Sequence, residues 1–248
     1  MENRTNKKVV GIILTYKAAS HLEELHKSLP MDILDDVFIS NDDTGDGIEK
    51  IAEKLNIKCF SHPRLGYGGN MKYGMKKAIE LGADYIVEIH GDGQFGREFI
   101  KPAVLKMKED EGYGLIIGSR FIDARQSLRD GMPLLRYIAN ITLTFIEKII
   151  LGVNISELHT GARVYSREVL ERPNIDNTSD DYLFSFEIIT QIVFMKMKIG
   201  EVPVRCYYNK EHTSISIKKS IVYGFETFGT LFYFIMARLG FKTRLFSR

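Results

Sequence analysis

The chain has 248 residues, of which 44% are hydrophobic and 27% charged, and its net charge is +2. This composition supports a folded core in one large domain or two small ones, and it excludes a disordered protein. Two cysteines, Cys59 and Cys206, without metal-ligand spacing exclude a disulfide framework and indicate a reducing compartment.

The N-terminal segment lacks the apolar core of a signal peptide, so the sequence predicts a protein that starts in the cytoplasm. Five apolar runs that follow have the length and β-branched content of buried strands. They cover residues 9–14, 37–40, 58–61, 86–89 and 115–117. Helical patterns lie between them, at residues 20–29, 48–55, 70–81 and 97–108. This alternation predicts an α/β fold, with one Rossmann-like, mostly parallel sheet and helices on both of its faces.

Polar or glycine-bearing segments follow three of the predicted strands. Thr15 and Tyr16 end the first strand, residues 41–47 follow the second, and residues 90–94 follow the strand at 86–89. Open α/β sheets bind their ligands at this carboxyl edge. In the third segment, side chains of His90, Asp92 and Gln94 could converge on one ion, or the segment could be a solvated turn.

Acidic and glycine residues after the second and third strands each have two interpretations. A carboxylate there can cap the next helix or bind a ligand, and we expect Asp46 to cap the helix that begins near Gly47 and Asp42 to bind. The glycines at residues 66–69 either form a turn or present a helix N-terminus to a phosphate.

Six blocks together resemble the inverting family 2 glycosyltransferases of GT-A fold, within them the branch of dolichol- and polyprenyl-phosphate sugar synthases. They occur in the family's order and cover about residues 8–215. Beyond the strand that ends in Thr-Tyr, they read Asn-Asp-Asp-Thr-Gly-Asp-Gly (41–47), Gly-Tyr-Gly-Gly-Asn-Met-Lys-Tyr-Gly (66–74), Ile-His-Gly-Asp-Gly-Gln (89–94), Ile-Gly-Ser-Arg-Phe (117–121), Thr-Gly-Ala-Arg-Val-Tyr-Ser-Arg (160–167) and Glu-Val-Pro-Val-Arg (201–205). The resemblance implies a GT-A domain over residues 1–215 and leaves residues 216–248 as a tail.

The resemblance also implies that a nucleoside-diphosphate sugar lies across the strand ends. The residues expected to contact it are Leu14, Thr15, Tyr16, Asp42, Gly68, Gly69, Lys72, Gly91 and Asp92. Asp42 matches the acid that reads the base. The chain departs from the family pattern at Leu14, Lys17 and Ala18, where relatives carry Pro, Asn and Glu.

A divalent metal is implied by the same family, which binds it through a D-x-D motif. Asp92 and Gln94 match the second acid and the glutamine after it, whereas His90 replaces the first acid. Oxygen ligands favour Mg²⁺, and a coordinating imidazole would favour Mn²⁺. Alternatively, His90 is a neutral histidine that hydrogen-bonds to sugar or backbone.

Arg120, Arg136 and Glu157 are implied to act on the acceptor. The two arginines match residues that the family uses near phosphate, and a guanidinium can hold phosphate through two hydrogen bonds. They could instead be surface arginines at helix ends. Glu157 stands where many relatives carry a general base, which a hydroxyl acceptor needs and an anionic lipid phosphate does not.

The tail combines an aromatic stripe with basic flanks. Its apolar residues recur at helical spacing between Lys218, Lys219, Lys242, Arg244 and Arg248, and from Lys196 onward the chain has ten basic and three acidic residues. Such an amphipathic helix lies in a membrane interface, or packs on the body or on a second subunit. Between Glu226 and Arg238 it is shorter than the roughly twenty residues that span a bilayer.

Three functions remain open. The first is an inverting, metal-dependent transfer of sugar to a polyprenyl phosphate by an enzyme on the inner face of the membrane. The second is transfer to a saccharide hydroxyl in lipopolysaccharide, capsule or glycan assembly, with Glu157 as base. The third is a non-catalytic module that binds nucleotide sugars. The aromatic register of the basic tail excludes nucleic acid as a partner.

Overall fold

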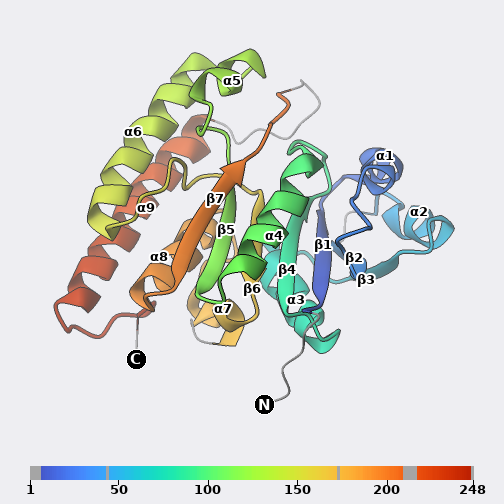
Figure 1. The fold of residues 1–248 in the computed structure, drawn as a ribbon, viewed down its shortest axis with the longest axis horizontal. Coiled ribbons are helices and arrows are strands. Elements are labelled where there is room, and N and C mark those ends of the chain that lie inside the picture. The colour runs from blue at the N-terminus through green and yellow to red at the C-terminus, as the bar shows by residue number, and fades with distance from the viewer. Residues whose placement is uncertain (1–6, 43–44, 172–173, 209–216, 247–248) are drawn as a thin grey trace.

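The strands form one sheet. The computed structural model describes residues 7–42, 45–171, 174–208 and 217–246. Within these residues the strands are β1 Val9–Thr15, β2 Asp36–Asn41, β3 Lys58–Ser61, β4 Tyr85–His90, β5 Tyr113–Ser119, β6 Arg163–Ser166 and β7 Lys198–Pro203. Their order in the sheet is β3-β2-β1-β4-β6-β5-β7 (Figure 1). β6 is antiparallel to β4 and β5, and the remaining pairs are parallel. The predicted α/β fold with a mostly parallel sheet is confirmed.

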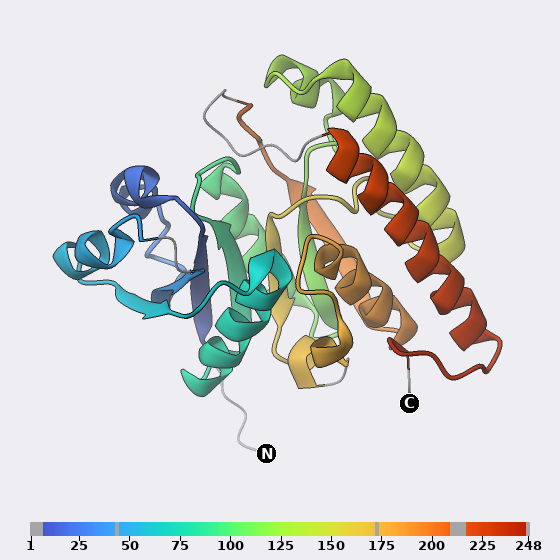
Figure 2. The ribbon, with the colours of Figure 1, turned by 180° about the vertical axis from the view of Figure 1, so that it is seen from behind.

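Helices cover both faces of this sheet. They are α1 Leu22–Lys27, α2 Ile48–Lys54, α3 Gly66–Glu80, α4 Ile100–Glu109, α5 Ala124–Arg129, α6 Leu134–Leu151, α7 Glu168–Glu171, α8 Phe184–Phe194 and α9 Ile217–Arg238, with short 3-10 turns at Ala19–His21, Arg97–Phe99 and Ile175–Asn177. α1, α2 and α4 close a hydrophobic core on one face. α3, α8 and part of α9 close the core on the other face, which Figure 2 shows from behind.

The register of the parallel strands aligns three of the predicted ligand-binding segments. Thr15 at the end of β1 pairs with Asn41 at the end of β2, and Leu14 pairs with His90 at the end of β4. Because these strands end level with one another, the segments that follow them meet at one edge of the sheet. The prediction of a site at the carboxyl edge rests on this alignment.

One predicted helix cap is wrong. The helix α2 begins after Gly47, whose φ is +81°, and no side chain caps it. The carboxylate of Asp46 instead accepts a hydrogen bond from Ala19 N at 3.1 Å, at the start of the turn Ala19–His21. A tertiary contact therefore takes the carboxylate that the local sequence assigned to its own helix.

α6 and α9 lie side by side at the β7 end of the sheet in both views (Figures 1 and 2). The sequence did not predict α6. It did predict α9, whose Leu231 and Phe234 are 2% and 3% exposed and belong to the core. The boundary between domain and tail at residue 215 stays a prediction.

The length of α9 corrects the expectation that the apolar stretch of the tail is too short to span a bilayer. Lys219–Arg238 is long and apolar enough to cross a membrane by length and composition, and it is the one such helix in the described part of the chain. A core helix of a soluble protein passes the same test but is mostly buried, whereas 28% of an 18-residue apolar window of this helix is buried. Three predictions rest on residues outside the description: the signal-peptide argument on residues 1–6, and the flanking charges on Arg248 and the Lys218 side chain.

Candidate functional site

A cleft of about 540 Å³ lies at the carboxyl edge of β1, β2 and β4. It brings together seven residues that the sequence placed at the site: Leu14, Thr15, Tyr16, Asp42, His90, Gly91 and Asp92. The opposite wall comes from residues 64–67, from Ser179–Tyr182 and from Lys219 at the start of α9. The sequence did not predict the contribution of residues 179–182. Its signal is the acidic pair Asp180-Asp181 directly before the apolar helix α8.

Asp42 fixes the loop that enters α3. Its carboxylate accepts hydrogen bonds from the backbone N–H groups of Leu65 at 2.5 Å and Gly66 at 3.1 Å, and its own N–H donates to Thr15 O. The side chain is nearly buried but lines the cleft. A carboxylate oxygen can accept more than one hydrogen bond, so this anchoring still allows Asp42 to accept one from a ligand.

Gly68, Gly69 and Lys72 support the wall formed by residues 179–182 and do not line the cleft. A Cβ at Gly68 would lie 2.4 Å from Ser179 O, so only glycine lets α3 approach this segment so closely. Gly69 N donates to Asp180 O, and Lys72 Nζ lies 2.6 Å from the Asp180 carboxylate and donates to a carbonyl nearby. Their direct contact with a nucleotide sugar stays a prediction.

The ring of His90 contacts the buried carboxylate of Glu88. Its Nε2 lies 3.1 Å from Oε1 of Glu88. The same oxygen accepts a hydrogen bond from the Tyr67 hydroxyl at 2.5 Å, and Oε2 accepts one from the Tyr165 hydroxyl at 2.9 Å. The ring lies where a Cβ at Gly161 would be 2.1 Å from Nε2, so the glycine makes room for it. Burial opposes protonation of His90, but the hydrogen bond and charge of Glu88 outweigh it and raise the pKa of the imidazole.

Arg163 balances the charge of this network. It is fully buried, and its guanidinium donates to three backbone carbonyls, including Ser185 O at 2.8 Å, and lies 3.4 Å from the Tyr165 hydroxyl. A buried carboxylate needs such partners because its desolvation is costly. The sequence missed this network. Its signals are a lone acid, Glu88, inside the apolar strand β4 and a lone arginine at the start of β6.

The donor set at the cleft fits a metal that takes most of its ligands from substrate and water. Asp92 is partly exposed in the cleft, and its Oδ1 accepts from Gln94 N at 3.0 Å. Gln94 itself is not among the lining residues, and Nε2 of His90 is occupied by Glu88. Within the described residues no group of three or more His, Cys, Asp or Glu side chains could hold a metal. Mg²⁺ is commonly bound through one or two carboxylates plus substrate phosphates, so Asp92 suits that mode.

Arg120 and Glu157 form a buried ion pair. Glu157 accepts hydrogen bonds from Arg120 N at 2.6 Å, from Nε at 2.7 Å and from Nη2, and neither side chain is more than 8% exposed. The guanidinium also donates to Tyr208 Oη and His159 O, each at under 3 Å. Burial disfavours the charged guanidinium, but the charge of Glu157 prevails and raises the pKa of Arg120.

These contacts change what the two residues can do. The structure does bring them together, but against each other and outside the set that lines the cleft. A carboxylate that neutralises a buried guanidinium would leave that charge uncompensated if it took a proton. Arg136, the second predicted phosphate ligand, is half-exposed in the first turn of α6 and also lies outside the lining set.

A second buried polar cluster ties α6 and α9 to the segment before β6. Glu147 of α6 is fully buried, with its Oε2 2.7 Å from Nε2 of His159, and Nδ1 of His159 lies 3.0 Å from the Tyr223 hydroxyl on α9. Burial and the charge of Glu147 raise the pKa of Tyr223. His159 also accepts from Arg120 through its backbone oxygen, so this cluster and the ion pair share one segment.

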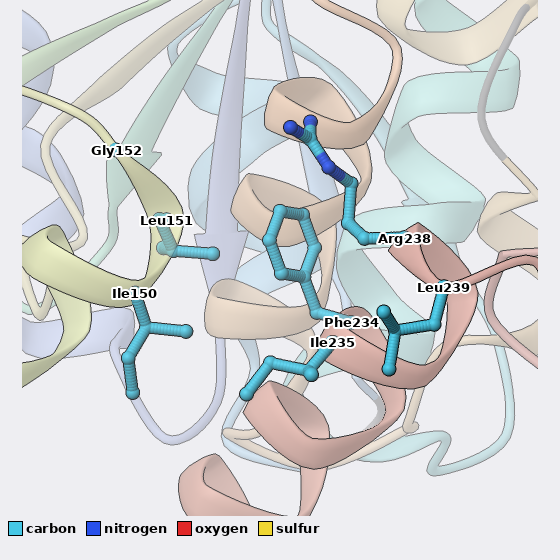
Figure 3. A pocket seen from close by; sticks show the side chains of 7 residues that line it. All are labelled: Ile150, Leu151, Gly152, Phe234, Ile235, Arg238 and Leu239. Carbon is cyan, nitrogen blue, oxygen red and sulfur yellow. The ribbon is translucent and has the colours of Figure 1, made fainter.

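A smaller cavity of about 250 Å³ lies between the ends of α6 and α9 (Figure 3). Apolar side chains line it, together with the stem of Arg238, whose guanidinium lies 5.9 Å from the Phe234 ring. It shares no residue with the cleft at the strand ends. We interpret it as a packing gap between two helices.

A known protein family and several known proteins are similar to this chain. The family model described as glycosyl transferase family 2 matches residues 12–172. Similar proteins include UDP-N-acetylglucosamine–dolichyl-phosphate N-acetylglucosaminyltransferase of Methanococcus voltae, which is 24% identical and aligns over 95% of this chain and 98% of its own. Another is polyprenol monophosphomannose synthase of Mycolicibacterium smegmatis, 24% identical over 81% of this chain and 78% of its own.

Among solved structures, the chain is similar to glucosyl-3-phosphoglycerate synthase from Mycobacterium tuberculosis, solved with Mn²⁺, UDP and glucosyl-3-phosphoglycerate. The TM-score is 0.69 at 15% identity, with 97% of this chain and 82% of that chain covered. At this identity the likeness supports the fold alone.

Proposed function

The chain belongs to glycosyltransferase family 2, and from this premise we propose that it transfers a sugar from a nucleoside-diphosphate sugar to a polyprenyl phosphate of the dolichol type. In this reaction a phosphate oxygen of the lipid bonds to the anomeric carbon from the face opposite the donor diphosphate. The bond from that carbon to the diphosphate breaks, and the nucleoside diphosphate leaves with the electron pair. The configuration at the carbon is therefore inverted.

The cleft supports binding of the donor. It lies at the level ends of three strands and is lined by Tyr16, Asp42 and Asp92. We assign Tyr16 and Asp42 to the base and ribose, and Asp92 to the diphosphate. A divalent cation, Mg²⁺ or Mn²⁺, would be held by Asp92 and the diphosphate, where it would neutralise charge on the leaving group. His90 does not need to be a ligand, because Glu88 already fixes one of its nitrogens.

The Arg120–Glu157 ion pair is the observation that favours a phosphate acceptor over a hydroxyl acceptor. A hydroxyl acceptor needs a base to remove its proton, and the acid at the family's base position is here committed to a guanidinium. A lipid phosphate is already an anion and needs no base. The names of the two relatives, a dolichyl-phosphate N-acetylglucosaminyltransferase and a polyprenol monophosphomannose synthase, agree with this choice.

An exposed apolar surface on α6 and α9 supports a peripheral position on the inner face of the membrane. This helix-pair surface consists of Leu134, Leu135, Ile138, Ile141, Phe145 and Ile149 of α6, and Ile221, Val222, Phe225, Phe228, Phe232 and Ile235 of α9, each at least 36% exposed. An apolar surface of this kind marks a membrane or protein partner. Because the last 53 residues carry ten basic and three acidic side chains, we assign it to an anionic leaflet.

The experiment that tests this function screens donors and then acceptors. GDP-, UDP- and dTDP-sugars are first compared by thermal shift with Mg²⁺ or Mn²⁺, because bound ligand raises the apparent stability. The selected donor is then incubated with a polyprenyl phosphate, the corresponding polyprenol, or a saccharide. We expect a lipid-linked sugar from the phosphate only. Transfer to the saccharide but not to the phosphate would overturn the proposed acceptor, and binding without any turnover would indicate a non-catalytic module.

A further inference from the structure

Helix α9 begins at the cleft and continues along the helix-pair surface. Lys219, in its first turn, lines the same cleft as Asp42 and Asp92. Val222 and Phe225 follow Lys219 at three-residue steps on the helix, lie outside the lining of the cleft, and are 49% and 74% exposed. One helix therefore joins the donor site to the surface that we assign to the membrane.

Lys219 supplies positive charge on one side of the cleft. Among the described residues that line it, Lys219 and Arg64 are the two with a permanent positive charge. Arg64 lies over the ring of Tyr16 at 4.7 Å, beside the end of β1, whereas Lys219 comes from α9. The two cations thus come from different elements, the loop before α3 and the first turn of α9, and the one on α9 precedes the exposed apolar side chains of that helix.

A polyprenyl phosphate needs both features close together. Its phosphate must reach the anomeric carbon inside the cleft, while its chain must leave across apolar side chains. From Lys219 to Phe225 the helix rises about 9 Å, at roughly 1.5 Å per residue, so one α-helix can meet both ends of such a ligand. Arg120, which the sequence favoured as the phosphate ligand, is already committed to Glu157.

Building on the proposed function, we propose that Lys219 binds the phosphate of the lipid acceptor, whose isoprenoid chain leaves the cleft over Val222 and Phe225. An ammonium is a flexible point charge with three donors, which suits a phosphate that must approach and then leave. The role is one of binding. Lys219 removes no proton from the acceptor, which is already ionised.

The test is the kinetics of Lys219→Ala and Lys219→Arg with farnesyl phosphate, a short isoprenyl phosphate that needs no membrane. Loss of a charge-assisted contact should raise the KM for farnesyl phosphate by roughly 10- to 100-fold in the alanine variant. The arginine variant should recover most of the affinity. The thermal shift produced by the nucleotide sugar should not change in either variant, because the donor is bound elsewhere in the cleft.

Lys50→Ala is the matched control, because Lys50 is an exposed lysine on α2, outside the lining of the cleft. It should keep the wild-type KM for farnesyl phosphate. An unchanged KM in Lys219→Ala, while the wild type transfers sugar to farnesyl phosphate, would overturn the role of Lys219 and leave the proposed function standing. A weakened thermal shift from the donor would reassign Lys219 to donor binding. A wild-type protein inactive with every isoprenyl phosphate would instead overturn the proposed function.

Discussion

The half of the sheet that carries the cleft and the end that carries α6 and α9 are built in opposite ways. Around β1 and β2 the helices α1 and α2 bury their apolar faces and place their lysines and glutamates toward water. At the other end, α6 and α9 expose Leu135 at 71% and Phe225 at 74%, while the acid Glu147 is fully buried.

This difference indicates what each end is built to meet. A buried charge is costly unless it is paired; Arg120 and Glu157 form such a pair, and Oε2 of Glu147 lies 2.7 Å from Nε2 of His159. Exposed apolar surface costs about 25 cal/mol per Å² in water, so an array of leucine, isoleucine and phenylalanine is unfavourable there. The helix-pair surface is therefore suited to an apolar partner, whereas the cleft is suited to a charged ligand from solution.

Asp92→Asn tests the cleft and has the largest expected effect. The substitution keeps the size of the side chain and removes the one carboxylate of the D-x-D-like segment, which lines the cleft. We expect turnover to fall by roughly three orders of magnitude, because metal-assisted stabilisation of the leaving diphosphate is lost. Urea unfolding should show nearly wild-type stability, which separates the loss from misfolding. Wild-type turnover in this variant would contradict the metal assignment.

Breaking the Arg120–Glu157 ion pair tests whether the buried charges outside the cleft stabilise each other. Arg120→Ala leaves the buried carboxylate of Glu157 without its partner, and Glu157→Gln leaves the buried guanidinium of Arg120 uncompensated. Each substitution should therefore lower the free energy of unfolding by about 3–5 kcal/mol. The double variant should cost much less than the two single costs combined, since the residues act as one pair. Urea titration measures all four corners of this cycle. Additive losses would show that the two side chains act independently.

Substitution on the helix-pair surface should affect stability least and membrane binding most. Leu135→Ser and Phe225→Ser change side chains that face outward, so we expect a change in unfolding free energy within about 0.5 kcal/mol. Sedimentation with anionic liposomes should fall for both variants, and high salt should weaken it in the wild type. Leu105→Ser is the control, because Leu105 is 47% exposed on α4 and lies outside the helix-pair surface. A wild type that ignores liposomes and forms dimers through this surface would replace the membrane by a second copy of the chain.

The sequence determined the cleft half in most of its features. Apolar runs and helical periodicity predict the alternation of strands and helices. Because parallel strands end at one edge of a sheet, the sequence also predicts that the polar residues Thr15, Asp42 and Asp92 lie together. The structure brings these three to one cleft. Local patterns suffice here because each residue's position follows from the strand that precedes it.

Only the tertiary structure decided the partners of the buried polar groups. Arg120 and Glu157 are 37 residues apart, His159 and Tyr223 are 64 apart, and Asp46 caps a turn 27 residues away. No local pattern encodes such a pairing, since it depends on how α6, α9 and the segment before β6 pack. The same packing decides that α9 contributes Lys219 to the cleft and leaves Phe225 exposed, because a helical stripe shows which residues share a face and not what that face meets.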